Sequence, residues 1–159
     1  MTALSTVQVR YVRRETLISV AINAVLSALF CLAIFGGRDA IDARALVLDA
    51  VPQSFMIALM TTIVPTLITR SRLRSGSVEP LPREASILPA NLAVRALAVA
   101  VAAALFGVLL NFLLLRVAGI DQLAFKPTLA WKITYGALLA FLLAPTLIRR
   151  ALADGVANG

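Results

Sequence analysis

The sequence predicts an all-α membrane protein of four transmembrane helices, arranged as two tandem hairpins that form a parallel repeat. The 159 residues are 60% hydrophobic and only 14% charged, with a mean hydropathy of +0.92, whereas soluble domains average about 45–50% apolar and roughly 25% charged residues. The chain holds four apolar stretches long enough to cross a bilayer. The phrase Pro-Thr-Leu-Ile-Thr-Arg at 65–70 returns eighty positions later as Pro-Thr-Leu-Ile-Arg-Arg at 145–150.

The four expected spans each supply roughly the 20 residues that a helix needs to cross the hydrocarbon core. The first, 17–35, contains no charged residue, and the second, 51–69, is the most polar. The third, 96–115, consists almost wholly of Ala, Val, Leu and Phe. The fourth, 129–148, opens with Trp131 and Lys132, which we expect in the head-group belt, where an amphipathic ring and a long amine both find water.

The repeated phrase divides the chain. It predicts a first hairpin over 1–77, a Pro-rich linker over 78–90 and a second hairpin over 91–159, related by an axis along the membrane normal. Residues 38–50 alternate charged with apolar side chains, which is typical of a short amphipathic segment at the interface between the first two spans. Pro65 and Pro145 each remove a helical hydrogen bond, so a kink is expected at both positions.

The basic residues predict the orientation. The tails and the middle loop carry ten Arg, and the two other connections carry five Arg or Lys. The positive-inside rule therefore predicts that both termini are cytoplasmic. Arg95 precedes a long apolar run, and we expect its side chain to extend back to the interface. The arginines expected to set topology and to meet anionic lipid head groups are Arg70, Arg72, Arg74, Arg149 and Arg150.

Polar residues recur along the spans at helical spacing. Ser19, Asn23, Ser27 and Cys31 follow one another every four residues, so they share one face of the first helix. Small and amide side chains on such a face allow helix backbones to approach and to form hydrogen bonds across the contact. The alternative is a polar pathway between this face and the second span. The candidate packing or pathway residues are Ser19, Asn23, Ser27, Thr61, Thr62, Thr66 and Asn111.

The residues that are missing exclude several classes of protein. The chain has no histidine and a single cysteine, which removes imidazole metal sites, bis-histidine haem ligation and intramolecular disulfide exchange. No Asp or Glu falls inside a predicted span, although coupled transporters usually keep a carboxylate there. No nucleotide-binding or hydrolase motif occurs. We therefore expect no enzyme activity, no catalytic or metal-binding residue, no cofactor and no nucleic-acid partner.

One resemblance can be drawn from the fourth span. Trp131, the pair Ala144-Pro145 and the pair Arg149-Arg150 make it similar to the second helix of small two-span bacterial membrane domains of unknown function. The resemblance covers about one hairpin and implies an inner-membrane location and a duplicated hairpin, but no activity. The first hairpin departs from that pattern at Val64 and Thr69.

Two functions fit these observations. The first is an accessory or structural subunit that packs in the bilayer against a larger complex or against its own copies. It is favoured by the small residues on the helix faces, the few charges in the spans and the short loops. The second is a small oligomeric permease or channel with a polar path between the first two helices, because four helices alone enclose little volume.

Overall fold

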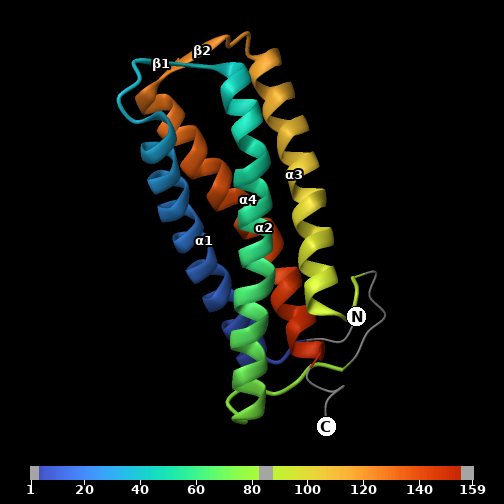
Figure 1. The fold of residues 1–159 in the computed structure, drawn as a ribbon. Helices are drawn as coiled ribbons and strands as arrows, with labels where there is room; N and C mark the ends of the chain where they lie inside the picture. Colours follow the sequence, from blue (N-terminus) through green and yellow to red (C-terminus); the bar gives the residue numbers. More distant parts are fainter. Residues whose placement is uncertain (1–3, 83–87, 155–159) are drawn as a thin grey trace.

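The computed structural model of the chain describes residues 4–82 and 88–154. It contains four helices, α1 (Thr6–Phe35), α2 (Ala43–Arg74), α3 (Leu92–Val117) and α4 (Phe125–Asp154), with short strands β1 (Ala40–Asp42) and β2 (Gln122–Ala124) (Figure 1). All four helices are long and apolar enough to cross a membrane. The prediction of a helical fold with four helices long and apolar enough to span a membrane is therefore confirmed.

The helices begin and end on local signals. Ser5 caps α1 in a capping box with Gln8, and Asn91 accepts hydrogen bonds from two backbone N–H groups at the start of α3. The side chains of both residues accept hydrogen bonds from backbone N–H groups that would otherwise lack partners. Beyond the far ends of these helices, Gly37 and Gly119 have φ values of +81° and +63°, a conformation that glycine adopts without strain.

The second helix starts earlier than its predicted span. Residues 43–50 form the first turns of α2, where we predicted a separate amphipathic segment. Leu46 is buried against Phe35 and Cys31, and Ala50 is also buried. The physical reason is that the apolar residues of this segment meet the end of α1 inside the bundle, so the helix continues instead of lying flat at the interface.

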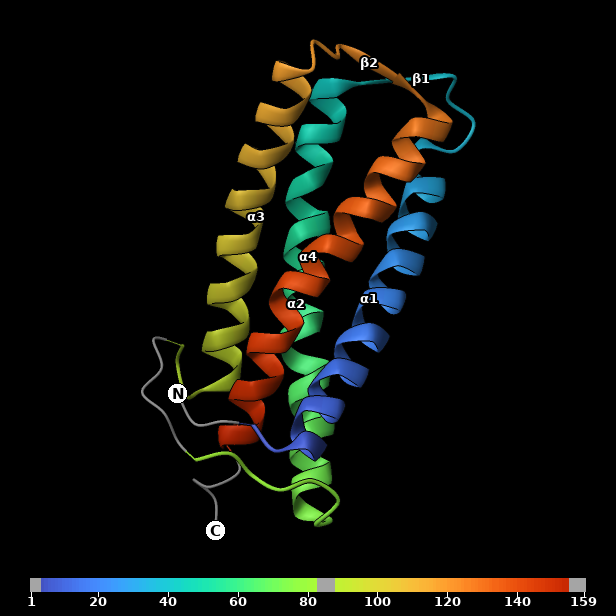
Figure 2. The same cartoon turned by 180° about the vertical axis from the view of Figure 1, so that it is seen from behind.

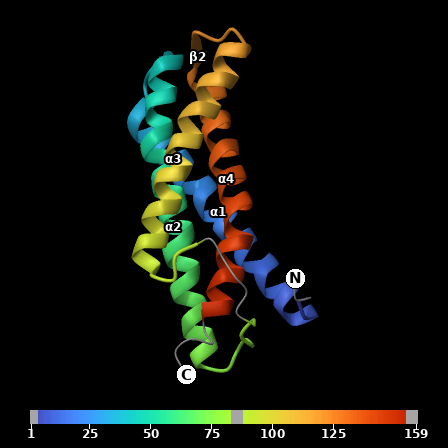
Figure 3. The same ribbon diagram turned by 90° about the vertical axis from the view of Figure 1, so that its right-hand side faces the viewer.

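The four helices run side by side along one long axis (Figure 3). We call the end where α1 begins and α4 ends the terminal end, and the end that carries β1 and β2 the strand end. The main helix contacts join α2 to α3, α1 to α4 and α2 to α4, whereas α1 and α2 touch at few points. Seen from behind, α4 crosses the bundle with α1 on one flank and α3 on the other (Figure 2). Successive helices of a predicted hairpin are therefore not each other's main partners.

Two close helix contacts are built from a serine facing a glycine. The hydroxyl of Ser54 on α2 lies against Gly107 on α3, and the hydroxyl of Ser27 on α1 lies against Gly136 on α4. In each case a Cβ atom added to the glycine would collide with the serine Oγ. Small residues at these points allow the two backbones to approach closely. The van der Waals packing that results is one of the forces that hold helices together in lipid.

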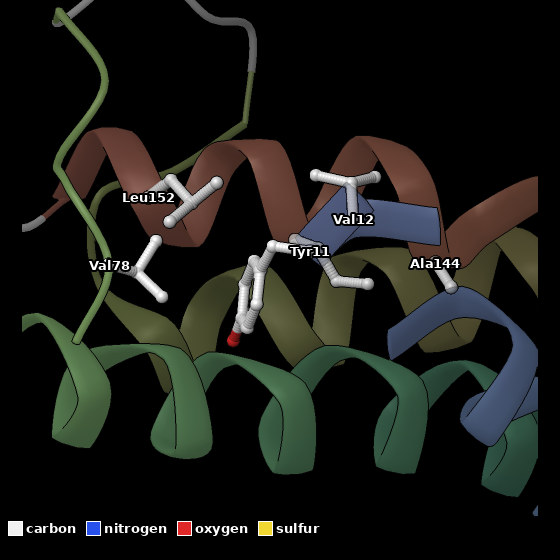
Figure 4. Packing of buried hydrophobic residues seen from close by; sticks show 6 residues of the cluster. Tyr11, Val12, Val78, Ala144 and Leu152 are labelled. Atoms are coloured by element: carbon white, nitrogen blue, oxygen red, sulfur yellow. The ribbon is translucent and has the colours of Figure 1, made fainter. Parts of the chain in front are cut away.

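The terminal end is closed by a small apolar core. Tyr11 and Val12 of α1 pack with Val78, which follows α2, and with Ala144 and Leu152 of α4 (Figure 4). The Tyr11 hydroxyl also forms a 2.9 Å hydrogen bond with Thr69 Oγ1 of α2. This core therefore holds three helices together at the end where the chain begins.

The strand end is closed by an antiparallel pair of strands. Ile41 of β1 pairs with Leu123 of β2, and Ile41 is buried in a cluster with Phe35 and Leu115. The Gln122 side chain donates a 2.8 Å hydrogen bond to Asp42 Oδ1. The two connections that leave the bundle at this end are thus tied to each other.

Pro65 and Pro145 lie inside α2 and α4, and both helices continue through them. The fourth predicted span, 129–148, extends to Asp154 at the terminal end. The predicted linker, 78–90, follows the end of α2 at Arg74 and includes residues 83–87, which lie outside the described part of the chain.

Replacing Gly107 with Ala tests the serine–glycine contact. Alanine gains roughly 1 kcal/mol in helix propensity over glycine, but its Cβ would separate Ser54 from Tyr135, whose hydroxyls form a 2.6 Å hydrogen bond. Overpacking costs about 1–3 kcal/mol, and the hydrogen bond is lost as well. We expect a lower free energy of unfolding in detergent micelles. Ala102→Val adds bulk to an exposed position of the same helix and should change little; equal stability of the two variants would contradict the contact.

Candidate functional site

The polar residues predicted along the spans all face the inside of the bundle. Ser19, Asn23, Ser27, Thr61, Thr62, Thr66 and Asn111 are buried. The face of α1 that carries Ser19, Asn23 and Ser27 is turned toward α4 and α2. There, Asn23 Nδ2 lies 3.4 Å from Thr61 Oγ1, and Ser27 meets Gly136.

Most of these side chains form hydrogen bonds with the backbone of their own helix. Thr62 and Thr66 donate to the carbonyl oxygens four residues earlier, at 2.7 and 2.6 Å. Asn23 donates to the Ser19 carbonyl oxygen at 2.8 Å. Asn111 donates to the Gly107 carbonyl oxygen and accepts a 2.7 Å hydrogen bond from Trp131 Nε1. These four side chains are thus hydrogen-bonded inside the bundle, as a lipid environment favours.

An ion pair joins α2 and α4 near the strand end. Lys132 Nζ contacts the Asp49 carboxylate, and both side chains are at most one-tenth exposed. Lys132 Nζ also lies 5.3 Å from the centre of the Phe35 ring. Lys132 is therefore covered by the bundle. Asp49, expected in a loop, lies inside a helix, because α2 begins eight residues before its predicted span.

Gln53 connects three helices beside this ion pair. From α2, its Nε2 atom donates to Ser27 Oγ of α1 and to the Lys132 carbonyl oxygen of α4, both at 3.1 Å. Gln53 lies one helical turn after Asp49, so the two side chains share a face of α2. Together Asp49, Gln53, Ser27 and Lys132 form the polar floor at the strand end of the space between α1 and α2.

Two adjoining cavities together form a groove in that space. One, of about 170 Å³, extends toward the strand end and is lined by Ile34, Asp49 and Lys132. The other, of about 90 Å³, extends toward the terminal end and is lined by Glu15 and Ile68. Three residues line both cavities, namely Asn23, Leu26 and Met60. We call this feature the α1–α2 groove.

The α1–α2 groove has apolar walls and the length of a membrane. From Glu15 to Ile34 the rise of 1.5 Å per residue gives about 28 Å, close to the ~30 Å hydrocarbon core. The side chains that form the walls, and that are partly exposed toward the surroundings of the bundle, are Leu26, Phe30, Ile34, Met56 and Met60.

A second ion pair lies at the other end of the groove. Arg72 of α2 donates to Glu15 Oε1 of α1 at 2.7 Å, and the Glu15 side chain is only 6% exposed. The Arg72 guanidinium also lies 5.2 Å from the centre of the Tyr11 ring. Because a single charge in hydrocarbon is costly, each carboxylate is paired with a basic side chain. The groove thus runs between two ion pairs.

The other arginines predicted to set topology lie at the terminal end. Arg74 and Arg149 are exposed, and Arg70 and Arg150 are partly buried. Arg95 differs from its expected position, because its side chain is fully buried and pairs with Asp154 at 2.8 Å. The Asp154 carboxylate, an acceptor inside the bundle, holds this guanidinium in its buried position. Within 4–82 and 88–154, no group of three or more His, Cys, Asp or Glu side chains could hold a metal ion.

Comparison of the chain with models of protein families, with curated proteins and with solved structures finds no match. What the arrangement can do must therefore be inferred from its geometry.

Sequence reasoning missed the residues that close the ends of the groove. Asp49 and Glu15 were assigned to a loop and to a tail, although a signal was present. Asp49 and Gln53 stand four residues apart and continue the face that later carries Ile57. Extending the second helix by two turns would have brought Asp49 into the bundle. Its partner, Lys132, could not be found in the same way, because nothing in the sequence aligns α4 with α2.

Replacing Lys132 with Met tests the ion pair at the groove floor. The change leaves the Asp49 carboxylate buried without its partner, which costs about 3–5 kcal/mol for a fully buried pair. We expect a clearly lower unfolding temperature in detergent, and partial recovery when Asp49→Leu is added. Lys126→Met, at an exposed position of the same helix, is the control. Unchanged stability of Lys132→Met would show that the pair contributes nothing.

Proposed function

We propose that this chain is an accessory subunit of a larger complex in a bacterial inner membrane, without catalytic activity of its own. In this proposal, the α1–α2 groove receives a transmembrane helix of the partner. The observation that carries it is the contrast within the spans, where the predicted polar side chains are buried inside the bundle while the groove has apolar walls along its length.

The length of the groove favours a helix over lipid as its occupant. A lipid acyl chain reaches only half of the ~30 Å hydrocarbon core, whereas a spanning helix follows all of it. The groove extends about 28 Å at the helical rise, from Glu15 to Ile34. Its wall includes Met56 and Met60, and methionine adapts its shape to irregular apolar surfaces.

The proposal includes a duplicated hairpin with both termini in the cytoplasm. Two features support the duplication. A two-fold exchange of hairpins maps the α1–α4 pair onto the α3–α2 pair, and each of these pairs has a serine–glycine contact, with the serine and the glycine on opposite sides in the two. The strands β1 and β2 also pair in antiparallel fashion. The start of α1 and the end of α4 lie at the same end of the bundle (Figure 1), and this position and the basic bias of that end support the orientation.

A permease is the second candidate, and one observation favours it. The groove floor holds a carboxylate, Asp49, paired with Lys132, together with Asn23 close to Thr61. Intramembrane ionisable residues commonly mark the routes of ions and substrates. Since a bundle of four helices encloses little space, such a permease would work as an oligomer.

The accessory function is tested by purifying the full chain in a mild detergent and identifying what accompanies it by native mass spectrometry. We expect a larger membrane protein in stoichiometric amount. A homo-oligomer free of other proteins would contradict the accessory function and direct the work to reconstituted transport.

Filling the groove tests where the partner binds. Met56→Trp places a large ring at the groove wall, so we expect the partner to be lost from the purified material. Leu105→Trp places the same ring on α3, where Leu105 is 70% exposed, and the partner should remain. Retention of the partner by Met56→Trp would rule out the α1–α2 groove as its binding site.

The combined variant Asn23→Ala, Thr61→Val and Thr62→Val separates the two candidates. It removes polar groups from the inside of the spans while nearly preserving the volume at both threonines. If these residues pack the bundle, assembly or stability falls, by about 1 kcal/mol for each lost hydrogen bond. If they form a pathway, reconstituted transport stops while the oligomer survives.

A further inference from the structure

Three arginines converge on one carboxylate at the terminal end of the bundle. Arg95 of α3, Arg70 of α2 and Arg150 of α4 lie 2.8, 3.4 and 3.5 Å from the Asp154 carboxylate of α4. We call these four residues the arginine cluster. It joins three helices and shares no residue with the α1–α2 groove.

The charges of the arginine cluster do not balance. Among residues 4–82 and 88–154, three guanidinium groups face one carboxylate, which leaves an excess of two positive charges. Arg95 is fully buried, and the side chains of Arg150 and Asp154 are about nine-tenths buried. Charges this poorly hydrated repel one another strongly unless counter-charges lie close. Asp154 supplies only one of them.

Several donors of the cluster also lack an acceptor. Within the described part of the chain, the Nε atoms of Arg70 and Arg95, and Nη1 of Arg95, are buried and form no hydrogen bond. Arg150 Nε is also buried, and its 3.5 Å contact with Asp154 Oδ1 is an ion pair without a hydrogen bond. Leaving a buried donor unpaired costs about 1–3 kcal/mol, and more for a charged group. The cluster therefore lacks both negative charge and acceptor atoms.

A phosphate group supplies both. It carries negative charge and several acceptor oxygens, and guanidinium groups bind such oxyanions through paired hydrogen bonds. The N-terminus of α3 does not provide this site, because Asn91 already accepts from the backbone N–H groups of Ala93 and Val94. The binding groups are the guanidinium side chains themselves.

The cluster is reachable from one side. The Arg70 side chain is 29% exposed, so an entering anion meets this guanidinium first. We propose that the arginine cluster binds one phosphate group, supplied by the head group of an anionic phospholipid or by a free phosphate-bearing solute. This site is independent of the partner proposed for the α1–α2 groove.

The experiment uses the full chain in a neutral detergent, to which phosphatidylglycerol, phosphatidylcholine or inorganic phosphate is added. Native mass spectrometry counts the bound lipids, and thermal unfolding reports stabilisation. We expect one phosphatidylglycerol to be retained at concentrations where phosphatidylcholine is not. If inorganic phosphate alone stabilises the protein and displaces the lipid, the cluster recognises the free anion. If it does neither, the lipid is the source.

Arg150→Gln and Arg149→Gln form a matched pair for this test. Each removes one positive charge from neighbouring positions of α4, but Arg149 is exposed and outside the cluster. We expect Arg150→Gln to weaken binding about tenfold, as the loss of one charge-assisted contact predicts, and Arg149→Gln to leave it unchanged. Arg70→Gln provides a second test if Arg150→Gln does not fold.

Two results would overturn the site. One is that neither phosphatidylglycerol nor inorganic phosphate binds the full chain above the level of phosphatidylcholine. The other is that Arg149→Gln and Arg150→Gln weaken binding equally, since this would mean a diffuse attraction of basic residues to anionic head groups.

Discussion

The close approach of helices at two glycines is the constraint on which this bundle depends. Helices in lipid gain no hydrophobic energy by associating, so they must pack closely and form hydrogen bonds. Gly107 and Gly136 allow α3 to approach α2 and α1 to approach α4. With those partners fixed and with α2 against α4, α1 and α2 are left with few contacts. The α1–α2 groove is thus a consequence of where the small residues lie.

The polar content of each helix corresponds to its place in the bundle. The stretches of α1 and α3 that could span a membrane are the more apolar, and they are less buried than those of α2 and α4. The central pair, α2 and α4, carries Ser54, Tyr135, Gln53 and Lys132, which bond across helix contacts. The outer pair turns apolar residues outward along most of its length.

The sequence was sufficient for four spans and for the polar residues that face inward, because composition and helical spacing record both. Asn23 and Thr61, for example, are both predicted to face inward, and they lie in hydrogen-bond range. The sequence was insufficient for the pairing of the helices. The polar side chain of Asn111 indicates that α3 has an inner face, but the hydrogen bond that Asn111 accepts from Trp131 depends on how α3 and α4 pack in three dimensions. The burial of two charged side chains could not be predicted for a related reason. Lys132 and Arg95 are each paired, inside the bundle, with a carboxylate from another helix.

The order in which the chain is made gives the Asp49–Lys132 pair a further meaning. The two residues stand eighty-three positions apart, so Asp49 enters the membrane long before its lysine is synthesised. Helix α1 likewise cannot pack against its main partner, α4, until α4 has been synthesised. Until the last helix inserts, the first hairpin holds an uncompensated carboxylate that lipid disfavours. Partly folded chains in general expose groups that the complete fold pairs or covers. A chain that stops before α4 would therefore keep the Asp49 carboxylate unpaired, and this charge would distinguish it from the complete protein.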